Sequence, residues 1–173
     1  MREKRRGGYL AVMVERTIAD PRATESQYDG ARSLGVDEAR LTLIVIAIWV
    51  GCSDVIVKLI KPTETGLYHK RTYFELVVIL AISAAAVYFV PLARSRSIAV
   101  GAGLMIGGGI GNALSIAIFP LGVPNPFFFS QDGWTIAFNL ADVCVGIGFV
   151  LMTASVFGLG IGRRHELREP VER

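Results

Sequence analysis

Long apolar runs separated by short polar links are the feature that most constrains how this chain folds. From Leu41 onward, four stretches of about 20 residues or more carry few charged side chains. A helix needs about 20 predominantly apolar residues to cross the hydrocarbon core of a bilayer, so each stretch is long enough to span it. Of the 33 charged residues, 15 lie within residues 1–40 and seven within residues 163–173. This segregation of charge predicts a membrane protein rather than a soluble domain.

The expected fold is therefore all-α: a bundle of four transmembrane helices. We expect residues 1–40, which mix charges of both signs, to form a mostly disordered cytoplasmic tail, with a short surface helix near Asp37–Leu41. Residues 163–173 are expected to form a basic cytoplasmic tail. The predicted transmembrane domain covers residues 41–162, with spans at about 41–60, 74–93, 98–119 and 136–162.

The distribution of Lys and Arg predicts the orientation of the bundle. The two tails and the link at residues 94–97 hold 14 of the 18 basic residues, and Lys58, Lys61, Lys70 and Arg71 lie on the other side. Basic residues are enriched in cytoplasmic loops, so both termini are expected in the cytoplasm. The links at residues 61–73 and 120–135 are then expected to face outward.

Composition and spacing exclude several classes of function. The net charge of +3 does not indicate nucleic-acid binding, because the arginines flank apolar spans. Cys52 and Cys144 lie inside apolar spans, where buried free thiols are expected. The segment Trp49–Cys52 resembles a lipobox only faintly, after a leader far too long for a signal peptide. We find no metal-ligand spacing, phosphate loop or nucleotide fingerprint, so no metal and no cofactor are expected.

Ionisable residues inside the spans are the candidates for function. A charged side chain at membrane depth costs ~2.5–3.5 kcal/mol on insertion scales. An ionisable residue there is therefore a candidate for a functional role. Glu75 begins a span and is expected to be interfacial. Asp54 precedes Lys58 by four residues, which favours a local ion pair on one helix face. Asp142 follows Asn139 by three residues, so these two side chains also share a face.

The third span carries small residues and a second asparagine. Five glycines lie between Gly103 and Gly111, and glycine allows close helix approach in lipid. We expect Gly103, Gly107 and Gly111, spaced by four, to face a neighbouring helix. Asn112 follows directly, at the end of the span where Asn139 begins the next one.

These segments together resemble the lipoprotein signal peptidase family, signal peptidase II. The run ending in Gly111-Asn112 is similar to that family's Gly-Asn-x-x-Asp-Arg, and Phe138 to Asp142 matches its Phe-Asn-x-Ala-Asp. Asp54 and Lys58 resemble its Asp-x-x-Ser/Thr-Lys element. The resemblance covers residues 41–162. It implies a bacterial inner-membrane location and cleavage of lipid-modified prolipoproteins by two aspartates, one acting as base and one as acid.

One of those two aspartates is missing. By the resemblance, Asp142 is the retained catalytic aspartate, Ser115 stands at the position of the other, and Ile116 replaces the arginine that follows. The family's Asn-x-Gly-Ala-Ala-Phe segment has no counterpart, and the 61–73 link is too short for a substrate-cradling platform of strands. The resemblance implies a substrate-binding role for four residues: Asn112, Asn139, Asp54 and Lys58.

Several functions stay open at this stage. A substitute carboxylate, Asp54 or Asp132, would restore a pair with Asp142, and Lys58 would be a base for Ser115. His69 and His165 are expected in opposite compartments, which excludes a shared site. The favoured interpretation is a signal peptidase II-like protein with reduced or lost activity. The alternative is a non-catalytic adaptor that binds a lipoprotein signal peptide or a partner helix; a transporter lacks the expected repeats. The expected partners are membrane lipid and prolipoprotein signal peptides, not nucleic acid.

Overall fold

Four helices dominate the structure, a computed structural model that describes residues 34–166 and the side chains of residues 34–159. They are α3 (Val36–Ile60), α4 (Tyr73–Phe89), α5 (Arg96–Ile118) and α6 (Leu140–Glu166), and the short 3-10 helix η3 (Val90–Ala93) continues α4. In this part of the chain these four helices are long and apolar enough to cross a membrane. The predicted helical architecture with four potential spans is confirmed, and four short strands that were not predicted add to it.

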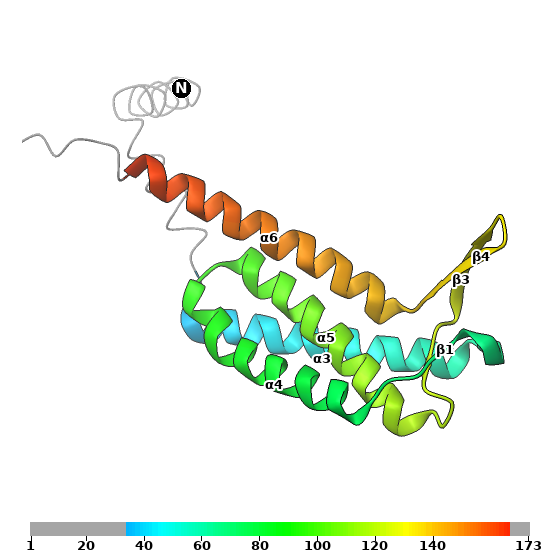
Figure 1. Ribbon diagram of the computed structural model, residues 1–173. Coiled ribbons are helices and arrows are strands. Elements are labelled where there is room, and N and C mark those ends of the chain that lie inside the picture. Colours follow the sequence, from blue (N-terminus) through cyan, green and yellow to red (C-terminus); the bar gives the residue numbers. More distant parts are fainter. Residues whose placement is uncertain (1–33, 167–173) are drawn as a thin grey trace, which may run out of the picture. The chain divides into compact units, whose positions relative to one another are not determined.

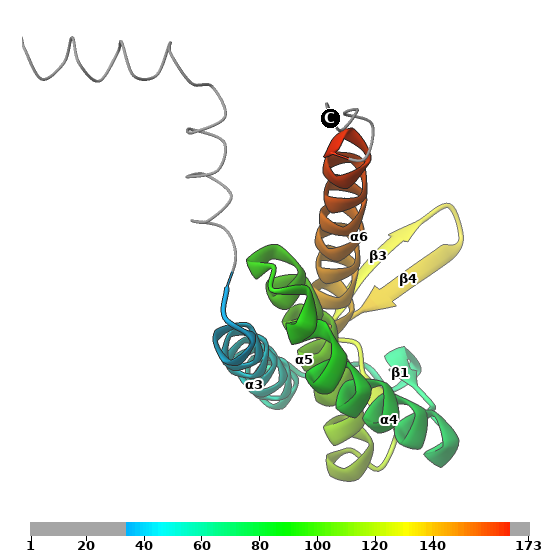
Figure 2. The ribbon, with the colours of Figure 1, turned by 90° about the vertical axis from the view of Figure 1, so that its left-hand side faces the viewer.

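Helix α5 is the centre of the bundle. It packs along both α3 and α6, whereas α4 makes a smaller contact with it (Figures 1 and 2). The Gly103, Gly107 and Gly111 face lies against α3: a Cβ atom at Gly107 would stand 2.7 Å from the Ala47 carbonyl oxygen. The predicted close packing of this glycine face is confirmed. Gly108 makes the same kind of approach to α6, where a Cβ atom would stand 2.5 Å from the Ala141 carbonyl oxygen.

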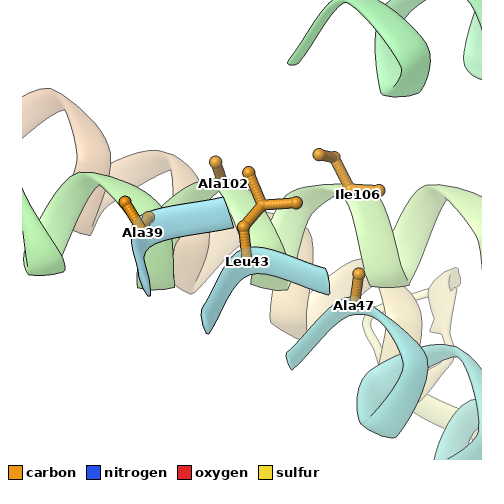
Figure 3. Close-up of a cluster of buried hydrophobic side chains, with 6 residues drawn as sticks. Ala39, Leu43, Ala47, Ala102 and Ile106 are labelled. Carbon is orange, nitrogen blue, oxygen red and sulfur yellow. The ribbon is translucent and has the colours of Figure 1, made fainter. Parts of the chain in front are cut away.

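Apolar side chains, most of them alanines, fill the rest of the α3–α5 contact. Ala39, Leu43 and Ala47 follow one another at every fourth position of α3 and are almost fully buried. They pack against Ala102 and Ile106 of α5 (Figure 3). This spacing of four lets the two backbones approach closely, as small residues do between helices in lipid.

The bundle has two distinct ends. At one end α3 begins, α4 gives way to α5, and α6 finishes (Figure 1). The Leu34 amide donates to the Arg94 carbonyl oxygen at 2.9 Å, which joins the start of α3 to the α4–α5 link. Arg94 itself adopts a left-handed conformation with φ of 51° in this tight turn. The assignment of this end to the cytoplasm stays a prediction.

The opposite end carries the short strands. The 61–73 link contains the 3-10 helix η2 (Thr65–Leu67) and β1 (Tyr68–His69), which pairs antiparallel with β2 (Val123–Pro124). β3 (Phe127–Gln131) and β4 (Trp134–Phe138) then form a hairpin that projects beyond the helices (Figure 1). The two links are therefore tied together at this end, although the 61–73 link supplies only a two-residue strand.

Three sequence-based boundaries differ from the structure. Residues Asp37–Leu41 form no separate surface helix but belong to the first two turns of α3. The fourth helix begins at Leu140 rather than at residue 136, because residues 134–138 pair with β3. It runs to Glu166, so residues 163–166 are helical rather than tail. The disordered tail was predicted for residues 1–40, of which residues 36–40 are helical and residues 1–33 lie outside the described residues. Residues 167–173 of the predicted C-terminal tail also lie outside them.

Candidate functional site

A buried ion pair organises the end of the bundle at which α6 begins. Lys58 donates from Nζ to Asp54 Oδ2 at 2.6 Å, one helical turn away on α3, and both side chains have no exposed surface. The predicted i, i+4 pair is confirmed. The same Nζ also donates to Asn112 Oδ1 at 2.8 Å and to Ser115 Oγ at 3.0 Å. An ammonium group has three protons, so each now has an acceptor.

Asp54 joins α3 to the start of α6. Its second oxygen, Oδ1, accepts from the Ala141 backbone N–H at 2.9 Å. Ala141 is the second residue of α6, and the first N–H groups of a helix have no partner within the helix. A carboxylate beside them is further stabilised by the helix dipole. Asp54 is therefore bonded on one side to Lys58 and on the other to the N-terminus of α6.

Helix α5 contributes the polar pair Asn112 and Ser115. Their spacing of three residues places both on the face that meets Lys58. The Ser115 hydroxyl donates to the Gly111 carbonyl oxygen at 2.7 Å, four residues earlier, and Ser115 is fully buried. Its oxygen is thus both a donor to its own helix and an acceptor for Lys58.

Asn139 and Asp142 cap α6 reciprocally. The Asn139 Oδ1 atom accepts from the Asp142 backbone N–H at 3.0 Å, and Asp142 Oδ2 accepts from the Asn139 backbone N–H at 3.1 Å. This exchange has the geometry of a capping box, with Asn139 in the N-cap position and Asp142 three residues later. The Asn139 Nδ2 atom donates to Asn125 Oδ1 at 2.7 Å, which fixes the link before the hairpin onto the cap.

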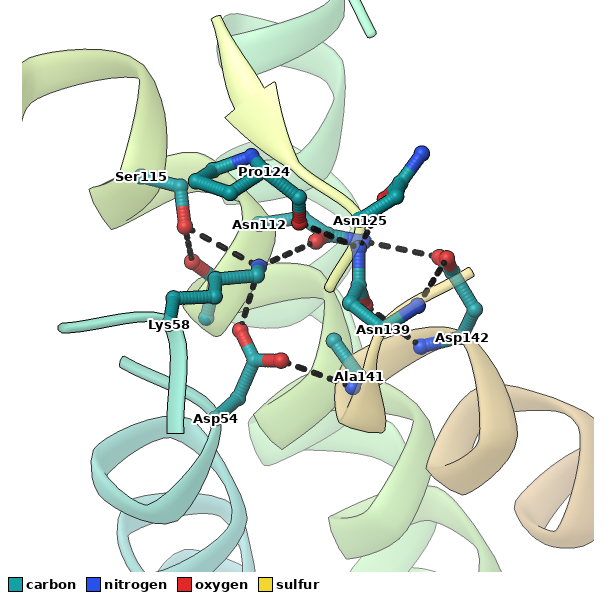
Figure 4. Close-up of polar contacts among 10 residues, drawn as sticks. Asp54, Lys58, Asn112, Ser115, Pro124, Asn125, Asn139, Ala141 and Asp142 are labelled. Atoms are coloured by element: carbon teal, nitrogen blue, oxygen red, sulfur yellow. Dashed lines mark hydrogen bonds and ion pairs between the residues drawn. The ribbon is translucent and has the colours of Figure 1, made fainter. Parts of the chain in front are cut away.

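One continuous chain of contacts connects the two carboxylates. Asn112 donates from Nδ2 to Asp142 Oδ1 at 3.1 Å while its Oδ1 accepts from Lys58 (Figure 4). The path from Asp142 to Asp54 thus runs through an amide and an ammonium group. The described hydrogen bonds of Asp142 come from Asn112 and Asn139, and none joins it to a second carboxylate. The predicted site residues from three helices are therefore brought together.

Asp132 does not join this cluster. It lies at the tip of the β3–β4 hairpin, where it and Gly133 both have positive φ values, 49° and 85°, as a two-residue hairpin turn requires. Trp134 and Phe138, the two ends of β4, are four residue steps apart, or ~13 Å at ~3.3 Å per residue. Asp132 is therefore well beyond the ~6 Å over which charges shift each other's pKa values.

The Lys58–Ser115 contact does not form a nucleophile with its base. A lysine acts as a base only when its amine is neutral, and here the ammonium group is paired with Asp54. Ser115 has no exposed surface from which to reach a substrate. The contact is a buried structural hydrogen bond.

The remaining reactive side chains lie outside the cluster. Cys52 is exposed on the surface of α3, contrary to the expected burial, because it borders an open groove between α3, α4 and α5. Cys144 is half-buried. Neither forms a disulfide. Within the described residues, no group of three or more His, Cys, Asp or Glu side chains is arranged to hold a metal ion.

Sequence reasoning missed two members of the site. Asn125 and the Pro124 carbonyl oxygen, which is 3.5 Å from Asn139 Nδ2, come from a link that the sequence marks only as rich in Pro and Gly. The residues from Val123 to Asn125 carry no sequence signal that places them beside Asn139. The short β1–β2 pairing brings them there, and it was not predicted.

Comparison with known proteins identifies the family. No curated protein sequence matches the chain. A sequence model described as signal peptidase (SPase) II matches residues 61–158, more than half of the chain, and this range includes Asn112, Ser115, Asn139 and Asp142. Together with the four spanning helices, this match shows that the chain is a multi-pass membrane protein of the signal peptidase II family.

Proposed function

We propose that this family member has lost, or retains only weakly, the two-aspartate cleavage of lipid-modified prolipoproteins. One observation carries the proposal: position 115, where the motif resemblance places an aspartate, holds a buried serine bonded to Lys58 and to its own helix. Acid–base cleavage by a carboxylate pair needs one protonated and one ionised partner. Asp142 instead accepts hydrogen bonds from the Asn112 amide and the Asn139 backbone N–H, and none of its described hydrogen bonds comes from a second carboxylate.

Asp54 does not replace the missing partner. It is fully buried, its two oxygens are engaged by Lys58 and by the Ala141 N–H, and Asn112 stands between it and Asp142. Using Asp54 as an acid would break the buried ion pair. Lys58 would then be left as a buried charge without a carboxylate partner. Such uncompensated buried charge costs ~3–5 kcal/mol.

The proposal places the protein in the bacterial inner membrane with both termini in the cytoplasm, as the distribution of basic residues favours. The end with Lys58 and Asp142 then faces outward, at the depth where a lipid-modified substrate would present its cleavage site.

Restoring the pair tests the proposal. The purified protein with Ser115→Asp, alone and with Ile116→Arg, is assayed against a diacylglyceryl prolipoprotein peptide. A general acid or base contributes ~10²–10⁴-fold, so cleavage by Ser115→Asp should rise well above that of the unaltered protein. Ser115→Asn is the matched control, because it adds similar volume without an ionisable group. Equal cleavage by both variants would contradict the role given to the carboxylate.

A second candidate, a non-catalytic adaptor for a signal peptide, is favoured by a groove of ≈ 330 Å³ beside this site. It lies between residues 61–67 and the base of the hairpin, where Lys61 Nζ sits 4.1 Å from the centre of the Phe127 ring. Binding of the lipidated peptide without cleavage, weakened by Phe127→Ala, would support the adaptor. Equal binding by the exposed control Phe129→Ala would argue against this groove.

A further inference from the structure

A larger groove lies between α3, α4 and α5. Its volume is ≈ 680 Å³, and Leu43, Ala47 and Ile106 are among the residues that form its lining. The groove exists because α4 makes only a small contact with α5, so the two helices separate along it. The lining is almost entirely apolar. The hydroxyl of Ser83, on the α4 side, already donates to the Ile79 carbonyl oxygen at 2.7 Å and needs no ligand.

Arg40 is the one charged side chain among the described residues that line the groove. Its guanidinium donates to Asp37 Oδ1 at 3.1 Å, but the Asp37 side chain is 94% exposed. An ion pair so open to solvent contributes little and is readily exchanged. The Arg40 guanidinium can therefore reorient and donate two N–H hydrogen bonds to a phosphate.

The dimensions of the groove match a lipid chain. From Arg40 to Cys52 the groove follows α3 for 12 residues, about 18 Å at ~1.5 Å per residue. The groove volume of ≈ 680 Å³ falls within the ~300–1,000 Å³ of small-molecule sites.

We propose that this groove binds one anionic glycerophospholipid from the leaflet on the Arg40 side, with an acyl chain along α3 and α4 and the phosphate on Arg40. Basic residues between helices at a membrane surface bind anionic headgroups in this way. The site is separate from the Lys58 cluster. Arg40 and Lys58 are 18 residues apart on α3, or about 27 Å, so the headgroup lies at the opposite end of the bundle.

The test measures lipid retained by the full-length protein in native mass spectrometry, with phosphatidylglycerol compared with phosphatidylcholine. Ala84→Trp places an indole in the groove and should abolish retention of both lipids. Ala85→Trp, on the next residue of α4 and outside the lining, should retain them. Arg40→Gln should reduce the preference for phosphatidylglycerol about fivefold, the effect of one basic residue, whereas exposed Arg96→Gln should not.

Cross-linking gives a second readout that does not require a bulky substitution. A benzophenone maleimide on Cys52, exposed at the groove, should cross-link phospholipid in vesicles, in a Cys144→Ser background. The same probe on Cys144, with Cys52→Ser, should cross-link far less. The proposal would be overturned if the two tryptophan variants retained lipid equally, or if Arg40→Gln left the preference for phosphatidylglycerol unchanged. It would also be overturned if the probe on Cys52 cross-linked a protein partner in place of lipid.

Discussion

Removing the Lys58 ammonium should strongly destabilise the protein, because it leaves a buried carboxylate without its counter-charge. In Lys58→Met, Asp54 loses the 2.6 Å contact, and Asn112 and Ser115 each lose a donor. Both charged side chains are fully buried, so no discount for solvent screening applies. Breaking one partner of such a pair costs ~3–5 kcal/mol. The Ala141 N–H still donates to Asp54, which places the expected loss near the lower figure.

The assay is thermal unfolding of the purified protein in detergent. A loss of about 3 kcal/mol corresponds to a fall in Tm of ~6–12 °C for a chain of this size. Adding Asp54→Asn to Lys58→Met removes the stranded charge and retains an oxygen for the Ala141 N–H. The double variant should therefore recover most of the lost stability, because replacing a buried pair by neutral groups costs little.

A matched pair on the surface provides the control. Arg71 and Glu75 have the same i, i+4 spacing, but they are 3.9 Å apart and partly exposed. Arg71→Met should cost less than ~1 kcal/mol. Two results would contradict a dry, buried ion pair. One is a Tm of Lys58→Met equal to that of the unaltered protein, and the other is a double variant no more stable than Lys58→Met.

Three further results follow from the same contacts. Gly107→Leu should sharply reduce folded protein in detergent by separating α5 from α3, whereas Gly146→Leu, with nothing within 4 Å, should be accepted; equal yields would contradict the packing. Asn139→Ala should lower the unfolding free energy by ~1–2 kcal/mol through loss of the α6 cap, measured by denaturant titration, and no change would exclude that role. Reporter fusions should read as cytoplasmic after Glu166 and external after Gly122, and an external reading after Glu166 would reverse the proposed orientation.

The helices could be predicted from sequence because membrane spans depend on length and apolar content alone. The Asp54–Lys58 pair could be predicted too, since spacing along one helix fixes which side chains are neighbours. Spacing does not say which other helix supplies the remaining partners. Asn112 and Ser115 reach Lys58 only because the glycine face of α5 lets the two backbones approach.

The hairpin was missed for a different reason. Residues 134–138 are apolar and run directly into the fourth span, so hydropathy alone extends the helix back to residue 136. The contrary signal was Asp132-Gly133, a dipeptide typical of two-residue hairpin turns between apolar runs. The capping role of Asn139 and Asp142 could also have been predicted. An Asn three residues before an acidic residue, at the start of an apolar run, is typical of a helix N-terminus.

The hydrogen bonds from Asn112 and Asn139 bear on whether Asp142 has a structural or a catalytic role. The N-cap exchange engages one carboxylate oxygen and Asn112 engages the other, so neither oxygen is paired with a second carboxylate in the described residues. A carboxylate held in this way can still act as a base, but it cannot supply the acid as well.

Cleavage by the unaltered protein tests the central claim most directly. The purified full-length chain is incubated in lipid vesicles with a diacylglyceryl prolipoprotein peptide, and release of the signal peptide is followed by mass spectrometry beside an Asp142→Asn variant. We expect no cleavage, or a trace rate that Asp142→Asn does not change. Rapid cleavage that is lost in Asp142→Asn and also in Asp54→Asn or Asp132→Asn would show that a substitute pair exists, and would contradict the loss of activity proposed for this protein.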